Sequence, residues 1–501
     1  MIKLPIHSTL NNWFGPRRTT HRTTHRTTHQ TPHQTPHHTT LLTAALALAL
    51  LLRLKTYLDN RSLFLDEANL TRNILEGSYG DFFAPLRYEQ YAPPGYLSIT
   101  KLSTLLFGSG EYALRLFPLL CGLASCFLFY RLLRKSSLHG WVVLGTMLLF
   151  AANHMLVRYA SEVKQYGCDV AIALLVLLSV EKDPLDEVRY QIPWFVAGMV
   201  LPWFSMPVVF LLGATGLFWA YRMPKTPKNI VRWLLLCGSW LASFGLYYLL
   251  ILRNDIGSEY LQNFHQPYFL SWSDPERSLS LLTDLLKQST GYTLVAVLFS
   301  AVGIMMGISR TPVSIVAAGS VVLCLLASLF GFYTLIGRTV LFTIPLLLFV
   351  IAVGWNELTR RHRWGLAIFG IILLHLVTLN TAVTYLWQPL AFSETRPVLT
   401  EIAERNTARY PVRTNEWAQP IYYYYVERPA APFRDRLPPQ FPLSVRFDTT
   451  VTGPTWHLYA HLSTEEAVRE AQAPYAQLPD SLKIIAPGTF AVFVPADIKT
   501  G

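Results

Sequence analysis

Charged residues are scarce in this sequence. Asp, Glu, Lys and Arg make up 15% of its 501 residues, whereas soluble domains carry about a quarter. Hydrophobic residues make up 51%, and the mean hydropathy is +0.30. A protein that is soluble throughout is therefore excluded. Apolar runs of membrane-spanning length continue to about Trp387 and predict a polytopic α-helical membrane protein.

Cysteine is also scarce, and no two cysteines form a C-x-x-C pair. Residues 390–501 contain none, which excludes a disulfide-based fold for that part of the chain. We expect the cysteines to serve as small apolar packing groups, because all of them lie within or beside apolar runs. They are Cys121, Cys126, Cys168, Cys237 and Cys324.

Residues 1–39 contain no acidic side chain and repeat Thr and His in a low-complexity pattern. Their Thr and Pro content disfavours a helix that would align the histidines on a metal. We therefore expect a disordered basic tail. No cleavage site of a secretory signal precedes Asp59, so the tail is predicted to stay attached and to be cytoplasmic.

The apolar runs predict about eleven membrane-spanning helices. Every loop that this arrangement places in the cytoplasm is basic, which accounts for the net charge of +11 without nucleic-acid binding. An odd number of spans places residues 390–501 outside, on the periplasmic face if the membrane is a bacterial inner (plasma) membrane. The predicted spans are 40–57, 112–133, 141–157, 166–180, a hairpin over 192–221, 233–252, 292–308, 313–332, 340–354 and 364–384.

The chain is thus predicted to have three parts: the tail (1–39), a transmembrane catalytic domain (40–389) and a small outer α/β domain (390–501). Between residues 70 and 108, amphipathic patterns predict helices that lie at the outer interface. The predicted elements of the third part are helices at 397–407 and 463–471, strands at 421–426 and 456–461, and a hairpin over 483–494.

Polar side chains gather where the chain is predicted to lie at the outer surface. Asp66 and Glu67 follow the first span, and Arg338 begins a span that is entered from outside. A carboxylate pair at a helix exit is costly unless it is solvated or functional, and a solvated cap is the commoner case. A carboxylate beside cations also suits glycosyl transfer from a lipid phosphate, which needs a base and a phosphate-binding site.

A second polar group follows the predicted span 141–157. Glu162 and Tyr166 are four residues apart and are predicted to share a helix face, with Arg158 and Lys164 beside them. Interfacial cations often only extend to lipid headgroups, and this explanation has equal weight for Lys101 and Arg115.

Three segments carry a resemblance to a known family. They are Asp66–Glu67 in LFLDEA, Pro93–Pro94 followed by Gly108, Glu111, Arg115, Leu116 and Pro118, and the RYASEVKQYG stretch that contains Glu162 and Lys164. In this order they resemble the GT-C superfamily of polyprenyl-phosphate-sugar glycosyltransferases. The nearest branch is that of the protein O-mannosyltransferases and the lipid A aminoarabinose transferase. Residues 337–345, with Arg338, and Trp456–His461 resemble two later family motifs. The chain departs from the family at Gly95, where Leu is usual, and at Lys164, where Arg is usual.

The resemblance implies a GT-C fold and a single-displacement, inverting transfer. Asp66 would be the base, Glu67 would support it or orient the acceptor, and Glu162 would be a further carboxylate of the site. Arg338 and Lys164 would hold the lipid phosphate, with Arg158 and Tyr166 beside them. The donor would be a polyprenyl-phosphate sugar, and the acceptor a glycan, a lipid or a protein. This branch generally needs no divalent cation, and no cofactor or metal site is predicted.

Several points stay open at this stage. The 253–287 segment, with His265 and Tyr268, is either a lid over the cavity or a plain connecting loop. The main alternative function is a flippase or transporter of lipid-linked saccharides, although the two halves show no internal repeat. A membrane anchor for a C-terminal binding module would not need so many spans. The C-terminal domain is expected to help select the acceptor.

Overall fold

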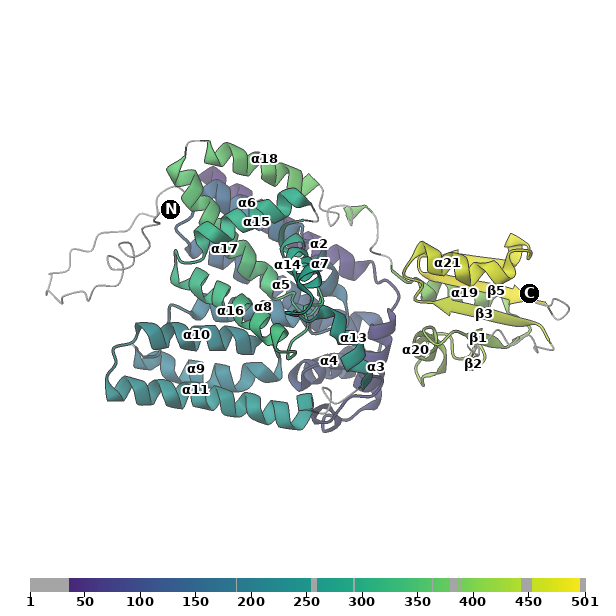
Figure 1. Ribbon diagram of the computed structural model, residues 1–501. Coiled ribbons are helices and arrows are strands. Elements are labelled where there is room, and N and C mark those ends of the chain that lie inside the picture. The colour runs from purple at the N-terminus through teal and green to yellow at the C-terminus, as the bar shows by residue number, and fades with distance from the viewer. Residues whose placement is uncertain are drawn as a thin grey trace.

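The computed structural model describes residues 36–185, 187–253, 259–291, 293–362, 364–378, 386–387, 390, 392–442 and 453–495. Most of the predicted tail lies outside these residues. Helices fill the first four fifths of the described chain, and a mixed α/β unit at its C-terminal end packs beside α3 (Leu65–Glu76) (Figure 1).

A helix forms wherever the described residues include a predicted span. Four of these helices are long and apolar enough to cross a membrane, or up to six if each bent pair is one span. The chain is therefore a multi-pass membrane protein, while the number of eleven spans stays a prediction. The helices are α2 (Pro36–Leu58), α5 (Glu111–Lys135), α6 (Gly140–Ala151), α7 (His154–Arg158), α8 (Tyr166–Ser179), α9 (Gln191–Val200), α10 (Val208–Arg222), α11 (Pro227–Tyr247), α15 (Leu294–Gly307), α16 (Pro312–Leu329), α17 (Thr343–Arg361) and α18 (Gly365–Thr378).

The prediction of one continuous helix over 141–157 is wrong. The Asn153 side chain accepts a hydrogen bond from the Leu156 backbone N–H, so it caps α7 and interrupts the helix there. The helices on either side are bent by 53°. The amide of Asn153 also donates to the Gln288 carbonyl, which fixes the break against α14 (Pro275–Thr290).

A buried guanidinium joins α2 to the end of α6. Arg53 is completely buried, and its Nη1 donates to the Ala49 carbonyl at 2.9 Å. Longer contacts of 3.5 Å reach the carbonyls of Phe150 and Ala151, at the C-terminal end of α6. Those carbonyls lack helical partners and carry partial negative charge, so they stabilise the buried positive charge of Arg53.

Glycine permits the closest helix contacts. A Cβ atom on Gly354 of α17 would lie 1.9 Å from the carbonyl oxygen of Gly303 in α15, so these helices can cross only with glycine there. A Cβ atom on Gly95 would lie 2.7 Å from the Phe204 ring. The aromatic ring therefore already fills the space that a larger side chain at position 95 would need.

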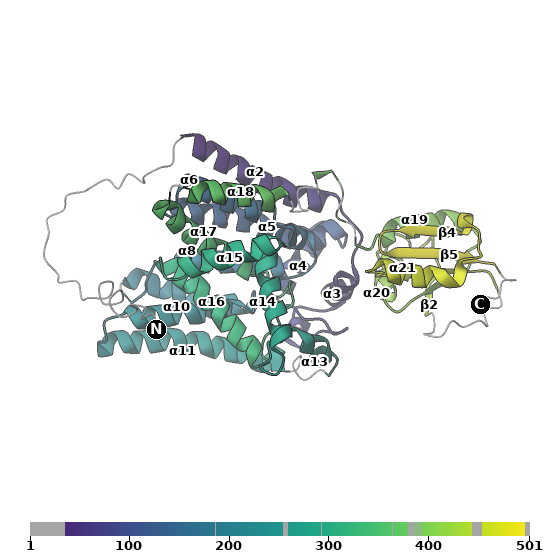
Figure 2. The same ribbon diagram turned by 45° about the horizontal axis from the view of Figure 1, so that its top comes forward.

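The segments before α5 and after α11 are helical as well as polar. The first polar segment (59–110) contains α3, a 3-10 turn at Asp81–Phe83 and α4 (Pro94–Phe107). The 253–287 segment is not a plain loop, because it forms α13 (Glu259–His265), a 3-10 turn at Gln266–Tyr268 and most of α14. In both views α3, α4 and α13 lie at the end of the helical part that faces the C-terminal unit (Figures 1 and 2).

The C-terminal unit contains a five-stranded sheet of order β2-β1-β3-β5-β4. Strand β1 runs parallel to both β2 and β3, and the connection from β1 to β2 passes through α20. Strands β4 and β5 form the predicted antiparallel hairpin, and β5 also pairs antiparallel with β3. Thr464 caps α21 as its sequence pattern predicted. The elements are α19 (Thr395–Arg405), β1 (Val412–Thr414), α20 (Gln419–Tyr422), β2 (Gln440–Pro442), β3 (Thr455–Ala460), α21 (Glu465–Gln472), β4 (Lys483–Ala486) and β5 (Thr489–Val494).

The predicted strand at 421–426 is wrong, since these residues continue α20 into a π-helical turn at Tyr423–Glu427. Tyrosine favours strands, but here tertiary contacts override that preference. The hydroxyl of Tyr425 accepts from the Leu63 N–H and donates to Glu111 Oε1, both at 2.9 Å. The Tyr424 hydroxyl donates to the Ser109 carbonyl at 3.0 Å.

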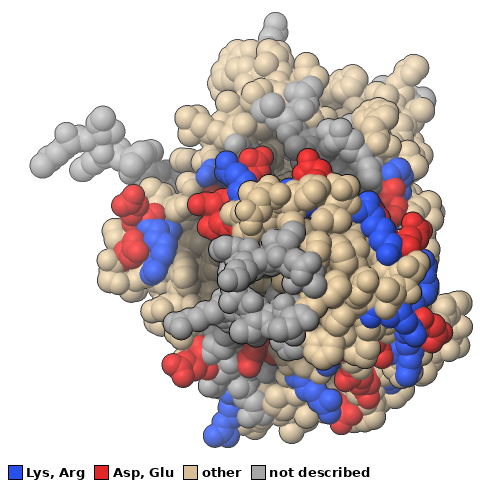
Figure 3. Space-filling view, turned by 90° about the vertical axis from the view of Figure 1, so that its right-hand side faces the viewer, with Lys and Arg blue, Asp and Glu red and all other residues tan. Residues whose placement is uncertain are grey.

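Further polar contacts attach the C-terminal unit to the first polar segment. Glu394 Oε2 accepts hydrogen bonds from the backbone N–H and the hydroxyl of Ser62. Arg396 forms an ion pair of 2.9 Å with Glu111. Acidic and basic side chains are interspersed on the face that looks away from the helices, as is typical of a solvated surface (Figure 3).

Candidate active site

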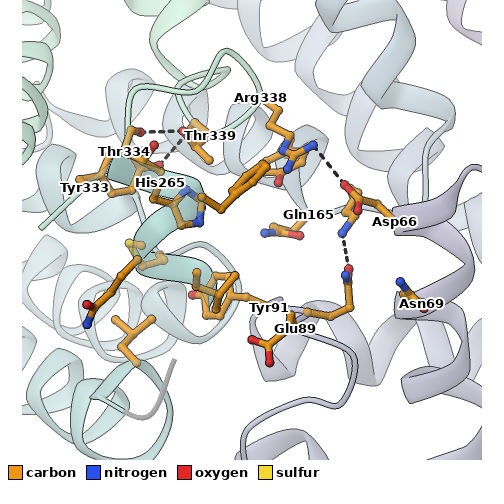
Figure 4. A pocket seen from close by; sticks show the side chains of 18 of the residues that line it. Asp66, Asn69, Glu89, Tyr91, Gln165, His265, Tyr333, Thr334, Arg338 and Thr339 are labelled. Atoms are coloured by element: carbon orange, nitrogen blue, oxygen red, sulfur yellow. Dashed lines mark hydrogen bonds and ion pairs between the residues drawn. The ribbon is translucent and has the colours of Figure 1, made fainter. Parts of the chain in front are cut away.

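A cavity of about 770 Å³ lies where the first polar segment, the start of α8, the 253–287 segment and the C-terminal unit meet. Figure 4 shows its side chains converging from these separate elements. Its volume is that of a small-molecule site. The connection between α16 and α17 also contributes to its wall. The titratable residues that line it are Asp66, Tyr88, Glu89, Tyr91, Lys164, Tyr166, Asp169, His265, Tyr333, Arg338 and Glu416.

Asp66 and Arg338 meet in this cavity although 272 positions separate them. Arg338 Nη1 donates to Asp66 Oδ2 at 3.1 Å, and each side chain remains about a quarter exposed. Burial by itself would raise the pKa of Asp66. The positive charges of Lys164 and Arg338 outweigh burial, so the pKa of Asp66 lies below its ordinary value and the carboxylate is charged at neutral pH.

Lys164 places a second cation on the same wall. It is 5% exposed, and its Nζ donates to Gln90 Oε1 at 2.7 Å. Burial lowers the pKa of Lys164, while the charge of Asp66 opposes that shift. The ammonium group is therefore held in the cavity by a neutral amide, which leaves donors for an anionic ligand.

Glu67 does not line the cavity. It is completely buried, and its two oxygens accept five hydrogen bonds: two from Arg115, one from Arg61 and one each from the backbone N–H groups of Phe64 and Val163. Burial would raise the pKa of Glu67, but the two guanidinium groups outweigh burial and lower it to about 2. Glu67 is thus a permanent anion that fixes the chain on both sides of Asp66.

Glu162 belongs to the same buried network. Its Oε2 accepts from Arg158 Nε at 3.0 Å and from Arg61 Nη2 at 3.4 Å. The prediction that Glu162 and Tyr166 share a helix face is wrong: Glu162 is extended, with φ −123°, and α8 begins only at Tyr166. The Arg158 guanidinium lies over the Phe392 ring at 3.8 Å, away from the cavity lining.

The remaining predicted site residues also divide into those that line the cavity and those that do not. Tyr166 and His265 line the cavity, whereas Tyr268 does not. His265 comes from α13, and burial lowers its pKa, so its imidazole is neutral at pH 7. The Tyr268 carbonyl accepts from the Leu335 N–H at 2.9 Å, which attaches this segment to the chain just before Arg338.

Sequence reasoning missed several residues of this site. Arg61 was not singled out at all, and Arg115 was not distinguished from cations that contact lipid, although it stands in one of the motifs of the resemblance. Glu416 and Trp417 line the cavity from the C-terminal unit. His461 follows β3 with φ +62°, and its ring packs against Phe64 at 4.6 Å, two residues from Asp66. Only the docking of the C-terminal unit brings these last three to the site.

Residues 91–201 match the family model described as dolichyl-phosphate-mannose-protein mannosyltransferase. The match covers the second and third segments of the predicted resemblance, which includes α4, α5 and Lys164. The resemblance to membrane glycosyltransferases is therefore confirmed over these residues. No curated protein matches the chain.

Two solved structures are also similar to this chain: ArnT from Cupriavidus metallidurans in the apo state and the same protein bound to undecaprenyl phosphate. Their sequence identities are 16% and 15%. Each alignment covers 91% of this chain and 98% of the other, with a TM-score of 0.48. A likeness at this level is evidence neither for the activity of this chain nor for its site.

Proposed function

We propose that this protein is a membrane glycosyltransferase that moves a sugar from a polyprenyl-phosphate donor to an acceptor hydroxyl or phosphate at the outer face of the membrane. The observation that carries the proposal is the pairing of Asp66 with Arg338 in a cavity that also holds Lys164. One carboxylate and two cations are the groups that this reaction requires. The family match adds weight, since its description names a prenyl-phosphate sugar.

The mechanism that we propose begins with an exchange of partners at Arg338. A donor phosphate that binds Arg338 and Lys164 competes with Asp66 for the guanidinium group, because phosphate accepts two parallel hydrogen bonds from it. Asp66 is then released, still ionised, beside the bound donor. The distance of 3.1 Å between Arg338 and Asp66 keeps base and phosphate site adjacent.

In the transfer step the acceptor oxygen attacks the anomeric carbon of the sugar. Asp66 accepts the proton of the acceptor hydroxyl as the new glycosidic bond forms. The bond between the sugar and the phosphate oxygen breaks, and the lipid phosphate leaves with the electron pair, stabilised by Arg338 and Lys164. A single displacement of this kind inverts the anomeric configuration. Glu67 and Glu162 hold the backbone around the site in this proposal and do not exchange protons.

The test compares purified wild type with Asp66→Asn in detergent. Each protein is incubated with a panel of undecaprenyl-phosphate sugars and crude envelope acceptors, and both donor binding and released undecaprenyl phosphate are measured. The proposal requires that wild type releases lipid phosphate from at least one donor. The Asp66→Asn variant should bind that donor without turnover, and Arg338→Ala should bind it more weakly. If both wild type and Asp66→Asn bind donors and neither cleaves them, a transporter of lipid-linked saccharides becomes the better explanation.

A further inference from the structure

Several residues that line the cavity carry buried polar atoms that have no hydrogen-bond partner. Five side chains on its wall each have a buried oxygen or nitrogen atom without a hydrogen bond among the described residues: Asn69 Oδ1, Gln165 Oε1, Asp169 Oδ1, His265 Nδ1 and Thr334 Oγ1. Folded proteins leave few buried polar atoms unpaired, because each costs the free energy of its lost hydration. Their concentration at one cavity indicates that a ligand supplies the missing partners.

Gln165 and Asp169 are the most informative of these residues. They are 5% and 4% exposed, and the Asp169 N–H donates to the Gln165 carbonyl at 3.1 Å where α8 begins. Both side chains therefore start from one rigid helical turn. Figure 4 shows the Gln165 amide extending into the space between the Asp66–Arg338 pair and His265.

The chemistry of two of these atoms disfavours the donor phosphate as their partner. The unpaired atoms of Asn69 and Gln165 are amide oxygens, which accept hydrogen bonds and repel phosphate oxygens. Among the described residues no ion pair involves Asp169. A hydroxyl group, which can both donate and accept a hydrogen bond, therefore suits Gln165 and Asp169, whereas Arg338 and Lys164 serve the anion.

We propose that Gln165 and Asp169 form a sugar subsite that binds ring hydroxyl groups of the lipid-linked donor, and that it adds affinity to that of the lipid phosphate alone. The inference rests on the proposed function and deepens it by assigning the recognition of the saccharide to the first turn of α8. Gln165 and Asp169 are positioned four residues apart, so adjacent hydroxyls of one ring can meet both. Specificity for the sugar then depends on these two side chains, separately from the phosphate site.

The experiment measures a ratio of affinities with full-length protein in detergent. Undecaprenyl phosphate and its glucosyl, galactosyl and mannosyl derivatives are titrated into wild type, Gln165→Met and Asp169→Ala. At least one sugar derivative should bind wild type more tightly than the bare lipid phosphate. In each variant, the ratio of the affinity for the sugar derivative to the affinity for bare undecaprenyl phosphate should fall roughly tenfold, which is the equivalent of one hydrogen bond to a buried group. The affinity for bare undecaprenyl phosphate should be unchanged.

A stability measurement separates recognition from folding. Gln165→Met keeps the side-chain length and removes an unpaired buried amide, so its Tm should equal or exceed that of wild type although sugar recognition falls. Thr71→Val is the matched control: Thr71 Oγ1 is also buried and unpaired, but it does not line the cavity. This variant should retain the wild-type affinity ratio.

Two results would overturn the sugar subsite. One is a wild type that binds every sugar derivative no better than bare undecaprenyl phosphate. The other is an unchanged affinity ratio in Gln165→Met. Neither result depends on turnover, so a failure of the subsite is distinguishable from a failure of the proposed transfer, which Asp66→Asn tests.

Discussion

Glu67 Oε1 accepts a hydrogen bond from the backbone N–H of Val163 at 2.9 Å. Each of these residues is the chain neighbour of a cavity residue, Asp66 in one case and Lys164 in the other. A single buried bond therefore fixes the distance between the proposed base and one of its cations. Arg61 and Arg115 complete the arrangement by neutralising Glu67.

Removal of the Glu67 charge is expected to destabilise the protein strongly. Glu67→Gln leaves Arg61 and Arg115 buried without their counter-ion, and breaking such a pair costs about 3–5 kcal/mol. Thermal unfolding in detergent should show a large fall in Tm. Glu357→Gln is the matched control, because the Glu357–Arg361 pair is solvent-accessible and is worth about 0–1 kcal/mol. Equal Tm losses in the two variants would contradict the role of Glu67.

Activity is expected to fall at alkaline pH because Lys164 loses its charge there. Burial lowers the pKa of this lysine from its ordinary value of 10.5, so its charge is lost as the pH rises through a value below that. Donor binding should weaken over the same range. Asp66 imposes the opposite limit: its lowered pKa keeps the base ionised until the pH falls below the ordinary aspartate value of 3.8.

Lys164→Arg tests this assignment directly. Arginine stays protonated at every accessible pH, so the alkaline limb of donor binding should move upward or disappear. The measurement is a titration of undecaprenyl-phosphate-sugar binding against pH in both proteins. If donor binding weakens at the same alkaline pH in wild type and in Lys164→Arg, a group other than Lys164 causes this loss of binding.

Gly95 and Phe204 are expected to be coupled. Gly95→Leu introduces a bulky side chain into space that the Phe204 ring occupies, and overpacking of this kind costs about 1–3 kcal/mol. Phe204→Ala should be destabilising alone but should offset part of the loss in the double variant. Chemical or thermal unfolding of the four proteins gives the coupling energy. If the losses of stability in the two single variants simply add up in the double variant, the clash is relieved by residues other than Phe204.

Hydropathy marked the positions of the helices, and five of the residues singled out from the sequence line the cavity. Loop charges together with the family resemblance pointed to Asp66, Lys164, Tyr166 and Arg338, and position alone pointed to His265. Hydropathy could not reveal the break at Asn153, because a capping side chain is compatible with an apolar run. It also could not determine which helices cross a membrane, since several described apolar helices are short.

The buried network and the C-terminal contribution could not be predicted for a different reason. Glu67 and Glu162 are carboxylates like Asp66, and only their partners show that they are enclosed by guanidinium groups. The pattern of a tyrosine-rich strand at 421–426 gave no sign that Tyr425 contacts Leu63, because sequence patterns describe local structure. Glu416 and Trp417 reach the cavity through the same docking.

The attachment of the C-terminal unit determines when the site can be assembled during synthesis. The bond from the Leu63 N–H to the Tyr425 hydroxyl spans 362 positions, and the bonds from Ser62 to Glu394 span 332. A ribosome has thus made more than three quarters of the chain before the residues around Asp66 meet these partners. Until then the first polar segment must be kept from misfolding by other means. A nascent chain arrested before Glu394 would have its proposed base and both cations, yet it would lack the residues that the C-terminal unit adds to the cavity wall.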